Sequence, residues 1–125
     1  MSVTPLELAR IAAAAADDKK ASDVVLLDLT KQSDVCDYFL VCTASNRRLS
    51  DAVVEEIEAK VLANSGAKPL SIEGREESTW VLMDYGSVVV HVFLPETRDY
   101  YRLERLWGDA PRVELGLGEG ARPTD

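Results

Sequence analysis

Hydrophobic residues recur at two different spacings along the chain, which predicts alternating helices and strands. Over residues 5–19 the apolar side chains are dense and helically spaced, and Thr4, Pro5 and Glu7 form a capping-box start with proline in the first turn. A second helix is predicted from Ser45 or Asn46 to Gly66. Its apolar positions fall three and four residues apart, and its charged positions lie off that stripe.

Short runs rich in Val and Leu predict the strands. Residues 23–30 and 37–44 are two such runs, and the polar link between them is too short for a crossover helix, so the two strands should be antiparallel if they pair. A third, short strand is expected at 70–72. Residues 80–84 and 87–94 should form an antiparallel hairpin, because Gly86 between them permits a tight turn.

A third helix is predicted over residues 96–107, with Trp107 on the side that should face the sheet. The element order then gives an α/β fold: a single domain with a mixed five-stranded sheet flanked by helices. We expect this domain to span residues 1–114. Residues 115–125 are rich in Gly, Pro and charge, and are expected to form a disordered C-terminal tail.

Composition narrows the class of protein. The chain has 125 residues, and its longest apolar run is far too short to cross a membrane. The apolar stretch near the start lacks the preceding basic residues of a secretion signal, so a cytoplasmic protein is expected. The net charge of −8 is spread along the chain. This disfavours direct, sequence-specific nucleic-acid binding and favours a basic protein partner.

Candidate chemistry is weak. The strand-to-helix turn "CTASNRRLSD" contains no glycine, so no phosphate-binding loop is present. Cys36, Cys42 and His91 do not supply the ligands of a zinc site, and neither a metal nor another cofactor is expected. Asp34 and Asp37 have the positions of turn and strand-end aspartates. Together with Asp28 they are the residues that a magnesium-dependent enzyme, the alternative function, would use.

The stretch "STWVLMDYGSVVVHVF", residues 78–93, raises a different possibility. Strand alternation places Trp80, Leu82 and Asp84 on one face of the sheet, and Val81 and Met83 on the other. Three helices are too few to cover both faces of five strands fully. Trp80 therefore either fills the core or lies on a partly open face that binds another protein; the pattern alone does not distinguish the two.

Several motifs in order resemble the ribosomal silencing factor, or Iojap, family: "DYFLVCT", "S-x-R" at the start of the second helix, "EG" before a tryptophan, "D-x-G-x-V-V-V-H-V" and "Y-x-L-E-x-L-W". The resemblance covers about residues 5–107. It implies a nucleotidyltransferase-like fold without a catalytic site, and a non-enzyme. It further implies a translational repressor that binds the large ribosomal subunit through ribosomal protein L14. Bound there, it would block joining with the small subunit when nutrients are scarce.

The same resemblance implies a homodimer when the protein is free, and it assigns site residues. It makes Trp80 the aromatic anchor, with Val81 and Leu82 as apolar neighbours. The acidic candidates for pairing with the partner are Glu73, Glu77 and Asp84, and two further family positions, His91 and Tyr100, have no assigned role. A dimeric adaptor without a ribosomal partner is a third hypothesis.

Overall fold

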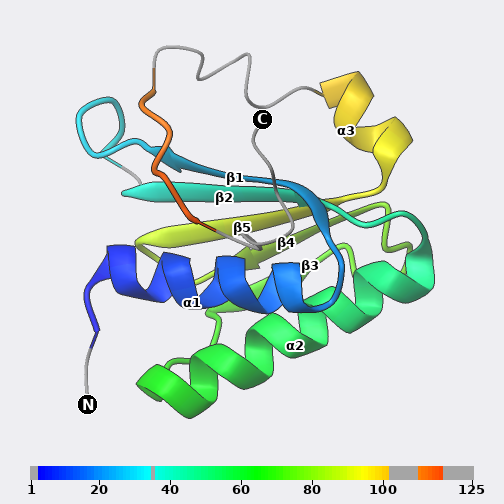
Figure 1. The fold of residues 1–125 in the computed structure, drawn as a ribbon, viewed down its shortest axis with the longest axis horizontal. Coiled ribbons are helices and arrows are strands. Elements are labelled where there is room, and N and C mark those ends of the chain that lie inside the picture. Colours follow the sequence, from blue (N-terminus) through cyan, green and yellow to red (C-terminus); the bar gives the residue numbers. More distant parts are fainter. Residues whose placement is uncertain (1–2, 35, 102–109, 117–125) are drawn as a thin grey trace.

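The computed structural model describes residues 3–34, 36–101 and 110–116, which form one α/β unit. Five strands make a single mixed sheet in the order β1-β2-β5-β4-β3 (Figure 1). The strands are β1 (Ser22–Asp28), β2 (Tyr38–Thr43), β3 (Ser71–Glu73), β4 (Trp80–Asp84) and β5 (Val88–Phe93). The helices are α1 (Pro5–Asp18), α2 (Arg47–Ser65) and α3 (Pro95–Tyr101). The predicted fold class is confirmed.

Local chemistry sets the ends of both long helices. The Thr4 hydroxyl accepts from the Glu7 backbone N–H at 3.1 Å, and the Glu7 carboxylate accepts from the Thr4 N–H at 2.9 Å, which completes the predicted capping box. In α2 the cap is Asn46 rather than Ser45, because the Asn46 side chain accepts from the Leu49 N–H. Gly66 ends α2 in the left-handed conformation, with φ of 77°.

The strand pairing explains which residues become neighbours. β1 and β2 are antiparallel, as are β4 and β5 and the pair of β3 and β4, as expected for short connections. β2 and β5 are parallel, and α2 lies between them in the chain. The central strands are thus brought together by a long crossover, and residues 39 and 91 come from opposite halves of the sequence.

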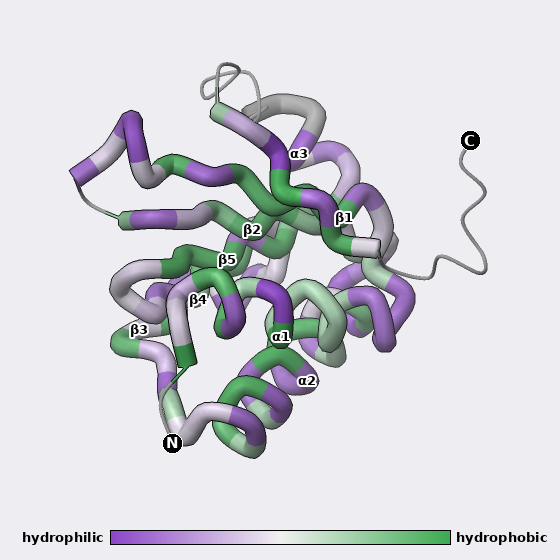
Figure 2. Tube along the Cα trace, turned by 60° about the vertical axis from the view of Figure 1, so that its left-hand side comes forward, coloured by the Kyte–Doolittle hydropathy of each residue, from purple (hydrophilic) through white to green (hydrophobic). Residues whose placement is uncertain are grey.

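Helices α1 and α2 lie side by side on one face of the sheet (Figure 1). Alternate side chains of the strands point toward them and form the main core, which includes Leu26, Leu40, Cys42, Met83 and Val90. The hydrophobic positions are concentrated in the central strands and along these two helices (Figure 2). A smaller cluster, formed by Leu27, Leu29, Cys36 and Ala110, lies apart from the main core.

The segment 110–116 covers the outer edge of β1. The Asp28 N–H donates to the Pro111 carbonyl and the Val113 N–H donates to the Leu26 carbonyl, each at 2.8 Å. Val113 and Leu115 also pack against the main core. Packing therefore reaches Leu115, the residue at which the sequence placed the start of the tail. Residues 117–125 lie outside the described part of the chain.

Helix α3 follows β5 and lies on the other side of the sheet from α1 and α2 (Figure 1). The Arg98 guanidinium attaches it to the sheet by donating to the Asp23 carbonyl at 2.6 Å and to the Thr43 hydroxyl at 2.8 Å. The predicted continuation of this helix to residue 107, including Trp107, falls outside the described residues. No helix among the described residues is long and apolar enough to span a membrane.

The opposite orientations of neighbouring β4 side chains give a stability prediction. Met83 is fully buried against the helices, whereas Leu82 is partly exposed on the other face. Met83→Ala should lower the free energy of unfolding by about 2–5 kcal/mol, because it leaves a cavity in the main core. Leu82→Ala, the matched control, should cost less than half as much. Chemical denaturation of both variants measures this, and equal losses would contradict the assigned orientations.

Candidate protein-interaction face

The sheet face turned away from α1 and α2 carries the partly exposed residues of β4. Along this strand Trp80, Leu82 and Asp84 are each partly buried, whereas Val81 and Met83 are fully buried. The predicted alternation is confirmed. The reason is the helix arrangement, since two long helices cover only one side of the sheet.

Four aromatic rings from three strands form the centre of this face: Phe39 of β2, Trp80 of β4, and His91 and Phe93 of β5; we call them the aromatic face. Trp80 lies directly opposite Phe93 in the antiparallel pair, and the two rings stack with centroids 5.1 Å apart. Phe39 and His91 meet edge to face, with centroids 4.6 Å apart and planes at 63°. Such contacts stabilise one arrangement of the rings beyond simple burial.

A hydrogen bond connects two of these rings. The Trp80 indole Nε1–H donates to Nδ1 of His91 at 3.2 Å. His91 is only 3% exposed, and this burial lowers its pKa from 6.5 to about 4. The ring is therefore neutral near pH 7, and its proton lies on Nε2, because Nδ1 accepts.

The loop before β4 fixes the approach of Trp80 to the face. Gly74 has a φ of 86°, and a Cβ there would collide with the backbone carbonyl of Trp80, so the position requires glycine. The Ser78 hydroxyl lies 2.8 Å from the Asp51 carboxylate of α2 and 2.9 Å from the Arg75 carbonyl, so its single hydrogen is shared between these two acceptors. This contact attaches the loop to α2.

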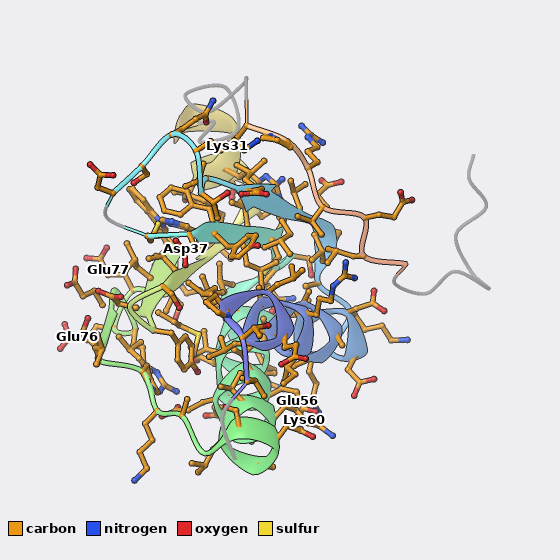
Figure 3. All side chains as sticks on the ribbon, turned by 90° about the vertical axis from the view of Figure 1, so that its left-hand side faces the viewer. Lys31, Asp37, Glu56, Lys60, Glu76 and Glu77 are labelled. Carbon is orange, nitrogen blue, oxygen red and sulfur yellow. The ribbon has the colours of Figure 1, made fainter. Side chains whose placement is uncertain are left out.

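The same loop presents negative charge beside the aromatic face. Arg75 turns toward α2, where its guanidinium lies 3.6 Å from the Glu55 carboxylate and 3.7 Å from that of Glu58. Glu76 and Glu77 are exposed and project from the edge of the molecule (Figure 3). Sequence reasoning had named Glu77 but not Glu76, because a charge in a loop gives no periodic signal of its direction.

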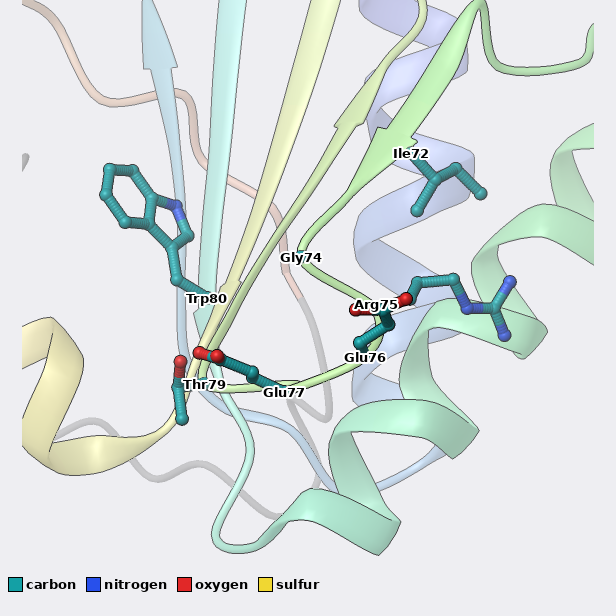
Figure 4. A pocket seen from close by; sticks show the side chains of 7 residues that line it. All are labelled: Ile72, Gly74, Arg75, Glu76, Glu77, Thr79 and Trp80. Carbon is teal, nitrogen blue, oxygen red and sulfur yellow. The ribbon is translucent and has the colours of Figure 1, made fainter.

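A hollow of about 440 Å³ lies at this loop, lined by Ile72, Gly74, Arg75, Glu76, Glu77, Thr79 and Trp80. The indole of Trp80 points to one side of the sheet, whereas Ile72 and Arg75 point to the side of α2 (Figure 4). Glu73 pairs with Leu82 across the β3–β4 ladder and so lies on the same face as Leu82. The aromatic face therefore has an acidic border made by Glu73, Glu76 and Glu77.

Asp84 has a structural role at the other end of β4. Its carboxylate accepts from the Gly86 N–H at 2.8 Å, which closes the turn of the hairpin. It remains partly exposed on the face, opposite Val89. Replacement by asparagine keeps the turn acceptor and removes the charge, so it separates the two roles more cleanly than charge reversal.

The side chains considered as zinc ligands or as residues of a magnesium-dependent enzyme have structural roles here. Cys42 is fully buried in the main core, on the opposite side of the sheet from His91, and burial raises its pKa to about 12. Burial also raises the pKa of Cys36. Asp28 accepts from the Thr30 hydroxyl and N–H, which lowers the pKa of Asp28. Among the described residues, no three His, Cys, Asp or Glu side chains lie close enough together to hold a metal ion.

Comparison with known proteins gives the family. Residues 2–124 match the family model described as "Ribosomal silencing factor during starvation". The ribosomal silencing factor RsfS of Bacillus subtilis is 47% identical over 109 residues, which covers 87% of this chain and 92% of that protein. This chain belongs to the ribosomal silencing factor family.

The fold agrees with the family assignment. A crystal structure of protein CV0518 from Chromobacterium violaceum superimposes with a TM-score of 0.81 at 34% identity, covering 95% of this chain and 98% of that one.

A more distant mouse relative, named "Mitochondrial assembly of ribosomal large subunit protein 1", is 32% identical over 91 residues, covering 71% of this chain and 40% of that protein.

The site residues expected from resemblance to the ribosomal silencing factor family divide into three groups. Trp80, Leu82, Asp84 and Glu73 lie together on one face, with Glu77 in the loop at its border. Val81 was wrong as a surface contact: it is fully buried in the main core, because adjacent strand residues point to opposite faces. His91 lies beneath Trp80, and the side chain of Tyr100 is outside the described part.

The buried histidine gives a pH prediction. In the unfolded chain His91 should titrate near 6.5, and in the folded protein near 4. Above pH 6.5 the ring is neutral in both states. As the pH falls from 6.5 to 4 the unfolded state binds the proton first, so the free energy of unfolding should decrease, by up to about 3 kcal/mol from this group.

Chemical denaturation from pH 7.5 to 4 measures the effect, with His91→Phe as the control that lacks the titrating group. The wild type should lose more stability than this variant over that range. Parallel pH profiles would contradict a buried, neutral histidine.

Proposed function

We propose that this member of the ribosomal silencing factor family represses translation by binding the large ribosomal subunit through ribosomal protein L14. Bound there in the cytoplasm, it blocks joining with the small subunit when nutrients are limiting. Support comes from the family description, which names silencing during starvation, and from the mouse relative, whose name refers to the large ribosomal subunit. The free protein is proposed to be a homodimer.

The aromatic face with its acidic border is the main observation in favour of this binding surface for L14. A partly exposed tryptophan on rigid neighbours is the kind of residue that anchors protein interfaces. Ribosomal proteins are typically basic, and the exposed carboxylates of Glu73, Glu76 and Glu77 beside Trp80 complement such a surface. We place the contact with L14 on Trp80, Leu82 and Asp84, with these glutamates at its rim.

Occlusion of the joining surface requires no chemistry from the protein, so the proposal includes no enzyme activity. This agrees with the structural roles of Asp28 and Cys42, which were considered for a magnesium-dependent enzyme and for a zinc site, respectively. The Asp28 carboxylate accepts the Thr30 N–H in a turn, and Cys42 and His91 lie on opposite faces of the sheet. The magnesium-dependent enzyme considered from sequence has no observation in its favour among the described residues.

The occlusion mechanism can be tested by subunit joining. Purified protein added to dissociated ribosomal subunits should sediment with the large subunit and lower the yield of joined ribosomes in proportion to its occupancy, because a bound protein excludes the small subunit. Sucrose-gradient sedimentation measures both quantities. Unchanged joining at saturating occupancy would contradict the occlusion mechanism, even if binding itself is observed.

Truncation of Trp80 tests its role as the anchor of the interface. Trp80→Ala should weaken binding to the large subunit by about 30- to 1,000-fold, the range for truncated interface anchors. The variant should lose about 1–3 kcal/mol of stability, because it removes the stack on Phe93 and the hydrogen bond to His91, and remain folded.

The matched control is Leu62→Ala, which truncates an apolar side chain that is 44% exposed on α2. It should bind like the wild type. Affinity measured by titration of labelled protein with large subunits decides the comparison. Equal affinities for wild type and Trp80→Ala would remove the aromatic face from the proposed interface.

A further inference from the structure

The orientation of the Trp80 indole depends on a contact made diagonally across two strands. Trp80 lies opposite Phe93 in the β4–β5 ladder, but its Nε1–H reaches back two positions along β5 to Nδ1 of His91, at 3.2 Å. Stacking on Phe93 fixes the height of the indole above the sheet, since the rings are tilted by only 26°. The hydrogen bond then fixes the direction in which the N–H edge points.

The acceptor is itself held in place. The His91 ring is almost parallel to Phe93, at 8° with centroids 6.1 Å apart, and Phe39 of β2 packs against it in an edge-to-face contact. Only 3% of the residue is exposed, so its ring cannot turn without moving these neighbours. A rigid acceptor beneath a partly exposed donor is the arrangement expected where an exposed side chain must keep one orientation.

The protonation state of His91 fits this role. Only a neutral imidazole with its proton on Nε2 can accept at Nδ1, and burial disfavours the charged ring. Nε2 is buried and has no hydrogen-bond partner among the described residues. The ring therefore carries the cost of a buried unpaired N–H while it serves as the acceptor for Trp80, which an apolar core residue at this position would avoid.

We propose that His91 is a positioning residue for partner binding: it holds the Trp80 indole in the orientation that contacts the ribosomal partner. The inference rests on the proposed function, since it assigns His91 a role in that interface without a contact of its own. An anchor already held in its bound orientation loses less rotamer freedom on association, so the effect appears as affinity.

The experiment compares His91→Leu with His91→Asn, and Trp80→Ala serves as reference. Leucine fills the site but cannot accept a hydrogen bond, whereas the asparagine amide oxygen lies near the position of Nδ1. Binding to purified large subunits should weaken about 3- to 10-fold in His91→Leu, as for loss of one hydrogen bond, and recover by at least half of that factor in His91→Asn. In ¹H–¹⁵N spectra the Trp80 indole resonance, assigned by its absence in Trp80→Ala, should shift and exchange faster with water only in His91→Leu.

The outcomes separate the two proposals. If Trp80→Ala binds like the wild type, the proposed interface is wrong, and the inference falls with it. If Trp80→Ala binds weakly but His91→Leu binds like the wild type, or if asparagine is no better than leucine, the positioning role alone is wrong.

A measurement on the wild type does not depend on any variant folding. The ¹⁵N shifts of the His91 ring at pH 7 should report a proton on Nε2 and an accepting Nδ1. A proton on Nδ1, or a charged ring, would overturn the assignment of His91 as the acceptor for Trp80.

Discussion

Among the described residues, long helices cover only one face of a sheet that is apolar on both, and the rest of the structure depends on this constraint. α1 and α2 bury the side of the sheet that carries Met83 and Val90, and the described part of α3, Pro95–Tyr101, lies at one end of the opposite side. The chain must therefore stabilise a partly exposed apolar surface in another way. It does so with aromatic side chains that pack on one another across β2, β5 and β4, together with a smaller cluster around Leu27.

That solution has a consequence for function. Phe93 and His91 are buried, whereas Trp80 is partly exposed, so the contacts that stabilise the face also hold Trp80 in one orientation. The loop of residues 74–79 reinforces this arrangement, because Gly74 allows the backbone to approach Trp80 and Ser78 attaches the loop to α2. With Arg75 paired to α2, the remaining charged side chains of the loop are acidic and face outward. Stability of the fold and complementarity to a basic partner thus arise from the same residues.

Sequence periodicity was sufficient to predict the helices and strands of the described chain. It also predicted which β4 residues share a face, because both features depend on local spacing. It could not predict contacts between segments that are far apart in the sequence. The contact between Phe39 and His91 requires the parallel pairing of β2 with β5, and the Trp80–His91 hydrogen bond requires the register of the hairpin to within one residue. Segment 110–116 pairs with β1 although its composition resembles a loop, since its hydrogen bonds come from the backbone. Val81 shows a different failure: family resemblance placed it at the interface together with Trp80, although strand alternation puts these two side chains on opposite faces, and the face that carries Val81 is the buried one.

The central claim is that the face not covered by α1 and α2 contacts the ribosome. Hydrogen–deuterium exchange of the protein, free and bound to purified large subunits, tests it most directly. Exchange reports protection along the whole described chain without any substitution. The account predicts that binding slows amide exchange in residues 73–84, while the solvent-facing ends of α1 and α2 exchange as in the free protein. Protection of α1 and α2 with unchanged exchange in residues 73–84 would contradict it.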